Sequence, residues 1–175
     1  MTEAIDTSIH ASAVLVGERA VLIRGPSDSG KSRLAFDLIL AGRANQIAAT
    51  TLVGDDRVHV FPAAGELMVR PASALSGLIE IRGLGIRQCP FASEAPVGLV
   101  VDLDAADAER LPPSEALRAR VEGILIPRIP VKQGFSGLSL VIAALTMTAN
   151  SSSARPSADC SKEFGNHISP TIATE

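Results

Sequence analysis

The feature that most constrains the fold of this chain is the octapeptide GPSDSGKS at residues 25–32. It matches the pattern G-x-x-x-x-G-K-[ST] at every fixed position, and that pattern requires a strand before it and a helix after it. Both flanks are present, because residues 20–23 are apolar and the residues after Lys31 place apolar side chains at helical spacing, up to a capping glycine at Gly42. We therefore predict a strand, a loop and a helix over residues 20–42.

The spacing of this loop suits the phosphates of a nucleoside triphosphate. Gly25 and Gly30 allow the backbone to turn so that successive N–H groups point inward, and the loop ends at a helix N-terminus, which favours anions. Lys31 is expected to reach the β- and γ-phosphates, and the Ser32 hydroxyl to bind Mg²⁺. A chance match in a glycine-rich turn is the alternative, and the correct flanks argue against it. We expect the nucleotide to contact Gly25, Pro26, Ser27, Asp28, Ser29, Gly30, Lys31 and Ser32.

The rest of the sequence predicts a single α/β domain with a mixed β-sheet. Residues 11–16 and 20–24 are apolar segments separated by turn residues, which favours a hairpin. The nearly continuous apolar run at residues 97–103 is typical of a strand buried on both faces. A second helix is expected at residues 138–148. Further strands are expected at residues 47–53, 57–61, 66–69, 78–81 and 124–131, the last at an edge because of its two prolines.

The ends of the chain and one internal segment differ from this pattern. Residues 1–8 are polar, so we expect a flexible N-terminus, and the Ser-, Pro- and Thr-rich residues 150–175 are expected to form a disordered tail. Pro112 and Pro113 limit any helix within residues 105–119 to a short one. The folded domain is expected to cover residues 9–149.

Composition argues against several classes of partner. The formal net charge is −3, and the chain has five Phe but no Trp or Tyr, which disfavours nucleic-acid binding through phosphate contacts or base stacking. No apolar run approaches the roughly 20 residues needed to span a bilayer, and the acidic N-terminus does not resemble a signal peptide. We therefore expect a cytoplasmic protein without a membrane partner.

Carboxylates at the predicted strand ends indicate magnesium-dependent phosphoryl transfer, which needs acids to hold the metal and to orient or deprotonate the nucleophile. Asp55 and Asp56 follow the strand that ends at residue 53, where one side chain can serve the metal and the other can accept a proton. The alternative is a solvated Gly-Asp-Asp turn. Asp102 and Asp104 end the buried strand and compete for the magnesium role, although aspartates commonly occupy strand ends.

The roles of three further polar residues are not decided by their spacing. Glu80 and Arg82 precede a glycine-hinged turn, where they could bind metal and phosphate or form an ordinary outward-facing strand pair. His10 lies just before the first hairpin, and a lone histidine is more often an ordinary surface or core residue.

In this order, the motifs Ile9-His10, GPSDSGKS, LVGDDRV and LIEIRGLGI resemble the catalytic domain of HPr kinase/phosphorylase. The resemblance covers roughly residues 9–145, and EIRGLGI at residues 80–86 is its most specific part. It implies the P-loop fold shared by HPr kinase and phosphoenolpyruvate (PEP) carboxykinase-like proteins. It further implies a kinase that uses ATP and Mg²⁺ to phosphorylate a serine of HPr, the small phosphocarrier of the sugar phosphotransferase system, and that can run the reverse phosphorolysis.

The resemblance also implies roles for individual residues. His10 resembles the histidine that orients a catalytic aspartate, and Asp55-Asp56 resembles the acidic pair, one member of which acts as base towards the serine hydroxyl. Glu80 resembles a magnesium ligand, and Arg82 belongs to the family signature near the active site. A homo-oligomer, specifically a hexamer, is implied as well.

One loop departs from the family pattern. The family carries Pro-Gly-Arg-Asn before its last helix, whereas this chain has VKQGFS at residues 131–136, with Lys132 as the basic residue there. The departure leaves the phosphorylase direction open. It also keeps two alternatives to the kinase in view, a P-loop ATPase or GTPase of another class and a non-catalytic nucleotide sensor. The family enzymes commonly carry an additional N-terminal domain, and this chain resembles the short form found in some proteobacteria.

Overall fold

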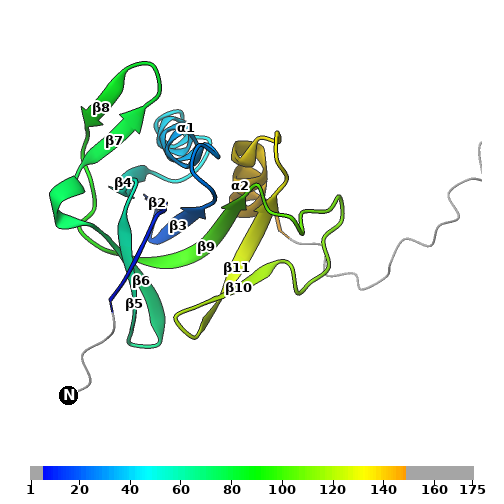
Figure 1. Ribbon diagram of the computed structural model, residues 1–175. Helices are drawn as coiled ribbons and strands as arrows, with labels where there is room; N and C mark the ends of the chain where they lie inside the picture. The colour runs from blue at the N-terminus through cyan, green and yellow to red at the C-terminus, as the bar shows by residue number, and fades with distance from the viewer. Residues whose placement is uncertain (1–5, 149–175) are drawn as a thin grey trace, which may run out of the picture.

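A mixed β-sheet of nine strands forms the centre of the protein, which the computed structural model describes over residues 6–148 (Figure 1). Its strands are β1 (Thr7–Ile9), β2 (Ser12–Val16), β3 (Arg19–Arg24), β4 (Thr50–Gly54), β5 (Val58–Ala63), β6 (Glu66–Pro71), β9 (Ala95–Leu103), β10 (Arg118–Val121) and β11 (Ile124–Val131). They lie in the order β1-β5-β6-β9-β3-β2-β4, and β11 pairs with both β9 and β10. A separate hairpin contains β7 (Leu78–Ile81) and β8 (Gly85–Gln88). The helices are α1 (Lys31–Arg43) and α2 (Gly137–Thr146), with one 3₁₀ turn at Ser73–Leu75.

Side-chain alternation along β3 divides the core between the two faces of the sheet. Val21 and Ile23 face the helices and pack in one cluster with Leu38 of α1 and Val141 of α2. Leu22 faces the other way and packs with apolar side chains of β5 and β6. Both helices therefore cover the same face of the sheet, as Figure 1 shows.

Strand directions bring several chain segments to one edge of the sheet. β3 runs parallel to β9, and β9 runs parallel to β11. β2 is antiparallel to both β3 and β4, so β4 runs in the same direction as β3. The carboxyl ends of β3, β4, β9 and β11 consequently meet the amino end of β2. Ligands of open α/β sheets bind at this kind of edge.

The structure confirms the predicted α/β class, the hairpin of β2 and β3, both helices and the predicted strands, with shifts of a few residues at their ends. β11 pairs with β10 over its first half and with β9 over its second half, so it has one neighbour at a time, as its two prolines indicated. Within residues 6–148, no helix is long and apolar enough to cross a bilayer.

Three expectations need correction. Thr7 and Ser8 belong to β1, so the predicted flexible N-terminus is wrong for these two residues, because their backbone completes the open edge of β5. No helix forms within residues 105–119, where turns around the prolines lead into β10, a strand that was not predicted. Gly85–Gln88 forms a strand that was not predicted, since all of its side chains are exposed and give no alternating pattern. The predicted tail at residues 150–175 lies outside the described residues.

Candidate active site

The loop at residues 25–32 has the backbone that its sequence requires. It connects β3 to α1 at the carboxyl edge of the sheet. A Cβ atom at Gly25 would lie 2.7 Å from Ser29 Oγ and 3.1 Å from the carbonyl oxygen of Leu103. Gly30, with φ +93°, has a conformation that residues with a side chain rarely adopt. Both positions of the motif therefore need glycine for structural reasons.

The N-terminus of α1 is left open for an anion. Gly30 offers no side-chain cap, and the first turn of α1 holds no acidic residue. Within the described part of the chain, the buried hydroxyl of Ser29 has no hydrogen-bond partner. Unpaired N–H groups at a helix start and an unused hydroxyl suit phosphate oxygens, so the residues present fit a nucleotide.

Lys31 is buried inside this loop. Its Nζ donates hydrogen bonds to the carbonyl oxygens of Gly25 (3.0 Å) and Pro26 (2.8 Å). Burial lowers the pKa of Lys31, and the nearby carboxylates of Asp55, and more weakly of other aspartates, oppose that change. Lys31 thus lies close to the predicted acidic pair, with an ammonium group that a phosphate would favour.

Asp55 is buried and held by two donors. Ser12 Oγ donates to one carboxylate oxygen at 2.5 Å, and the backbone N–H of Glu80 donates to the other at 3.1 Å. Only 3% of Asp55 is exposed. The carboxylate is therefore fixed between the start of β2 and the strand β7.

A β-bulge in β4 precedes Asp55. Ala13 of β2 lies opposite Gly54, but the next residue, Val14, lies opposite Leu52. Val53 is therefore an extra residue without a partner on β2. A bulge of this kind bends a strand and changes the direction of the side chains that follow, and bulges are common beside active sites.

Asp56 has the opposite environment from its neighbour. Its side chain is 70% exposed, and Oδ1 lies 3.3 Å from Nε2 of His10. The backbone of Asp56 is left-handed, with φ +66°, so the two adjacent carboxylates are presented differently. The structure thus combines one anchored carboxylate and one accessible carboxylate next to a histidine.

The hairpin of β7 and β8 carries the last two predicted site residues, Glu80 in β7 and Arg82 in the turn. The amide of Glu80 reaches Asp55, while its side chain is exposed. Arg82 lies in the turn itself, and its Nη2 donates to Asp28 Oδ1 of the phosphate loop at 2.5 Å. Close to its turn, the hairpin therefore contacts Asp55 through Glu80 and the phosphate loop through Arg82.

The oxygen donors near the loop suit magnesium. Among residues 6–148, no three His, Cys, Asp or Glu side chains form a ready cluster of metal ligands. Mg²⁺ usually takes only one or two carboxylates and keeps water and substrate phosphate oxygens. Ser32, Asp55 and Glu80 offer such hard oxygen donors, although a complete site would need the phosphates.

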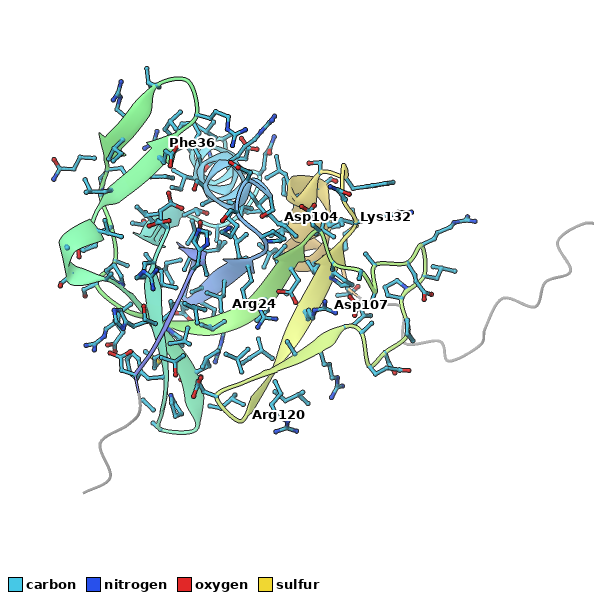
Figure 2. The ribbon with its side chains drawn as sticks, in the orientation of Figure 1. Arg24, Phe36, Asp104, Asp107, Arg120 and Lys132 are labelled. Atoms are coloured by element: carbon cyan, nitrogen blue, oxygen red, sulfur yellow. The ribbon has the colours of Figure 1, made fainter. Side chains whose placement is uncertain are left out.

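The competing aspartate, Asp102, is engaged elsewhere. It accepts hydrogen bonds from Arg24 at 2.7 and 2.8 Å and from Arg128 at 2.5 Å, and Arg128 also pairs with Asp107. Burial alone would raise the pKa of Asp102, but these two guanidinium groups outweigh it and hold the pKa below its usual value. Figure 2 shows Arg24 beside β9 and Asp107 beside β11, and Asp104 and Lys132 near α2. Asp102 therefore has a structural set of partners.

Comparison with known proteins places this geometry in a family. Residues 2–167 match the family model described as HPr Serine kinase C-terminal domain. The chain belongs to this family. The HPr kinase/phosphorylase of Streptococcus pneumoniae strain Hungary19A-6 is 36% identical over 156 residues, which are 81% of this chain and 47% of that protein. The protein of strain R6 gives the same values. The chain thus spans about half the length of these curated relatives.

A solved structure extends the likeness to three dimensions. The HPr(Ser) kinase/phosphatase from Coxiella burnetii matches with a TM-score of 0.63 and 26% identity, over 79% of this chain and 93% of that one. This match confirms the predicted kinship with the HPr kinase fold.

Sequence reasoning missed two contacts of the HPr kinase domain. Ser12 anchors Asp55 from 43 positions away, and Asp28 binds Arg82 from 54 positions away. Neither contact has a local sequence signal. Only the pairing of β2 with β4 reveals that Ser12 and Asp55 share an edge of the sheet.

Proposed function

We propose that this chain is an ATP- and Mg²⁺-dependent serine kinase that acts on the phosphocarrier HPr. One observation carries the proposal: the phosphate loop, the acidic pair and the family signature turn, distant in sequence, are joined by direct contacts at one sheet edge. Asp55 provides the central link, because it contacts Ser12 and Glu80 and lies near Lys31. Membership of the HPr serine kinase family supports the choice of acceptor.

The geometry supports Asp56 as the base. Its exposed carboxylate accepts the proton of the acceptor serine while His10 orients it. The serine oxygen then forms a bond to the γ-phosphorus of ATP, and the bond between that phosphorus and the bridging oxygen of ADP breaks. Lys31 and the open N-terminus of α1 stabilise negative charge on the phosphates.

The buried neighbour has a different role. Asp55, with both oxygens already accepting hydrogen bonds, fixes the position of the loop that carries Asp56. Mg²⁺, held by oxygen donors among Ser32, Asp55 and Glu80, would neutralise phosphate charge.

The decisive experiment is phosphorylation of HPr. The chain is incubated with ATP, Mg²⁺ and HPr, and the intact mass of HPr is measured. We expect one added phosphate on serine, its loss in Asp56→Asn, and retained ATP binding in that variant. ATP binding without any phosphoserine would rule out the kinase and favour a nucleotide sensor, whereas ATP hydrolysis without transfer would indicate an ATPase.

We further propose that the kinase works in the cytoplasm as a homo-oligomer. α2 exposes Leu140 and Leu145, and Met147 follows it with 72% of its surface exposed. Exposed large apolar side chains on one helix and just after it support contact between copies. Light scattering after gel filtration tests this, and a monomeric mass would rule it out.

A further inference from the structure

We propose that Asp28 sets the affinity of this chain for ATP by competing with the nucleotide phosphates for Arg82. The inference rests on the proposed function only as far as ATP binding at residues 25–32. The sequence motif leaves position 28 free, so nothing in the pattern requires a carboxylate there.

The first observation is the location of the carboxylate. Asp28 lies within the phosphate loop and has a left-handed backbone with φ +65°, a conformation that Gly, Asn and Asp tolerate best. Its charge acts on Lys31, although more weakly than the charges of Asp55 and Asp56. A negative group thus lies on the loop where the negative triphosphate binds.

The second observation is the partner of Asp28. Arg82 Nη2 donates to Asp28 Oδ1 at 2.5 Å, and both side chains are more than 80% exposed. Exposed ion pairs are weak, about 0–1 kcal/mol, so the pair opens readily. A guanidinium prefers the greater charge and the bidentate geometry of a phosphate.

The third observation is the attachment of the hairpin. β7 packs beside α1, with Ile79 and Ile81 against its core, so the turn that carries Arg82 stays next to the loop (Figure 1). Arg82 can therefore exchange one oxygen partner for another without leaving the site. Binding of ATP must first separate Arg82 from Asp28, and this requirement weakens binding.

The test is a double-mutant cycle on ATP binding. Asp28→Asn removes the charge but keeps the size and the tolerance for φ +65°, so it isolates the electrostatic effect. We expect the Kd for ATP with Mg²⁺, measured by calorimetry at low salt, to fall about fivefold, and the gain to shrink at high salt. The matched control is Asp37→Asn, which removes the same charge from the Arg33–Asp37 pair on α1, where Arg33 is exposed and Asp37 half-buried, and should leave Kd unchanged.

The decisive arm places Asp28→Asn in an Arg82→Gln background. If Asp28 and the phosphates compete for Arg82, Asp28→Asn should improve the affinity for ATP much less in the Arg82→Gln protein, because Arg82 is no longer present to be released. An equal or larger gain in that background, or no gain in Asp28→Asn alone, would overturn the proposal. The calorimetry contains no HPr, so it tests ATP binding independently of phosphate transfer. If the chain binds ATP but does not phosphorylate HPr, only the kinase assignment is contradicted. Absence of ATP binding by the unaltered chain would overturn both.

Discussion

Removal of the Ser12 hydroxyl should destabilise the protein by leaving a buried carboxylate short of one donor. Ser12 is fully buried and Asp55 is 3% exposed, so water has no access to replace the lost hydrogen bond. Hydrogen bonds to charged groups contribute roughly 1.5–3 kcal/mol, and Asp55 has two such bonds. We expect Ser12→Ala to lower the free energy of unfolding by about 2 kcal/mol, with a fall in Tm of about 4–8 °C for a chain of this size.

The assay is urea denaturation followed by far-ultraviolet circular dichroism. The chain contains no Trp or Tyr, so intrinsic fluorescence would report little. Ser8→Ala is the matched control, because Ser8 is exposed and its hydroxyl accepts a long contact of 3.4 Å from Arg57. Its effect should stay below about 0.5 kcal/mol.

The same variant should also affect activity. Asp55 loses one of its two anchors, so phosphate transfer should slow even at temperatures where Ser12→Ala is fully folded, while ATP still binds. If Ser12→Ala and Ser8→Ala had equal stabilities, the view that Ser12 anchors a buried charge would be refuted.

Three more predictions follow from packing, charge and the altered loop. Asp102→Asn should lower the free energy of unfolding by about 3 kcal/mol at pH 7, because it takes the carboxylate partner from Arg24 and one of two carboxylate partners from Arg128. Since the pKa of Asp102 is lowered in the fold, its stabilisation is present above about pH 4 and lost below, so the acid-unfolding curves of the two proteins should converge there. Gly42→Ala should lower the free energy of unfolding by about 1–3 kcal/mol through overpacking, because the added Cβ would lie 2.6 Å from Thr50 Oγ1 and 2.9 Å from Thr50 N. An unchanged Tm would contradict that packing. Phe135→Arg combined with Ser136→Asn should increase phosphate-dependent dephosphorylation of phosphorylated HPr, and no increase would dissociate this loop from the reverse reaction.

The local parts of the site follow from the sequence. The phosphate loop needs only a strand before it, a helix after it and two glycines, and all of these are readable within about 25 residues by the motif pattern. The position of Asp55 and Asp56 also follows, because a strand end can be placed from the apolar run before it. These features depend on short-range chain geometry.

The contacts that assemble the site depend on strand register, which the sequence does not encode locally. Asp102 could be a metal ligand or a structural residue until β9 is placed beside β3, where Asp102 lies opposite Arg24. β1, β8 and β10 were missed because each has only three or four residues, too few for a clear alternating apolar pattern.

The unpaired residue in β4 makes the active site sensitive to chain length. Deletion of Val53 would leave Gly54 opposite Ala13 and Leu52 opposite Val14 in a regular ladder, so it would remove the bend that directs the aspartates after β4. Such a deletion removes one fully buried apolar side chain but no side chain of the site. We would expect it to leave a foldable sheet without a usable base, whereas many substitutions of Val53 by another apolar residue should be tolerated.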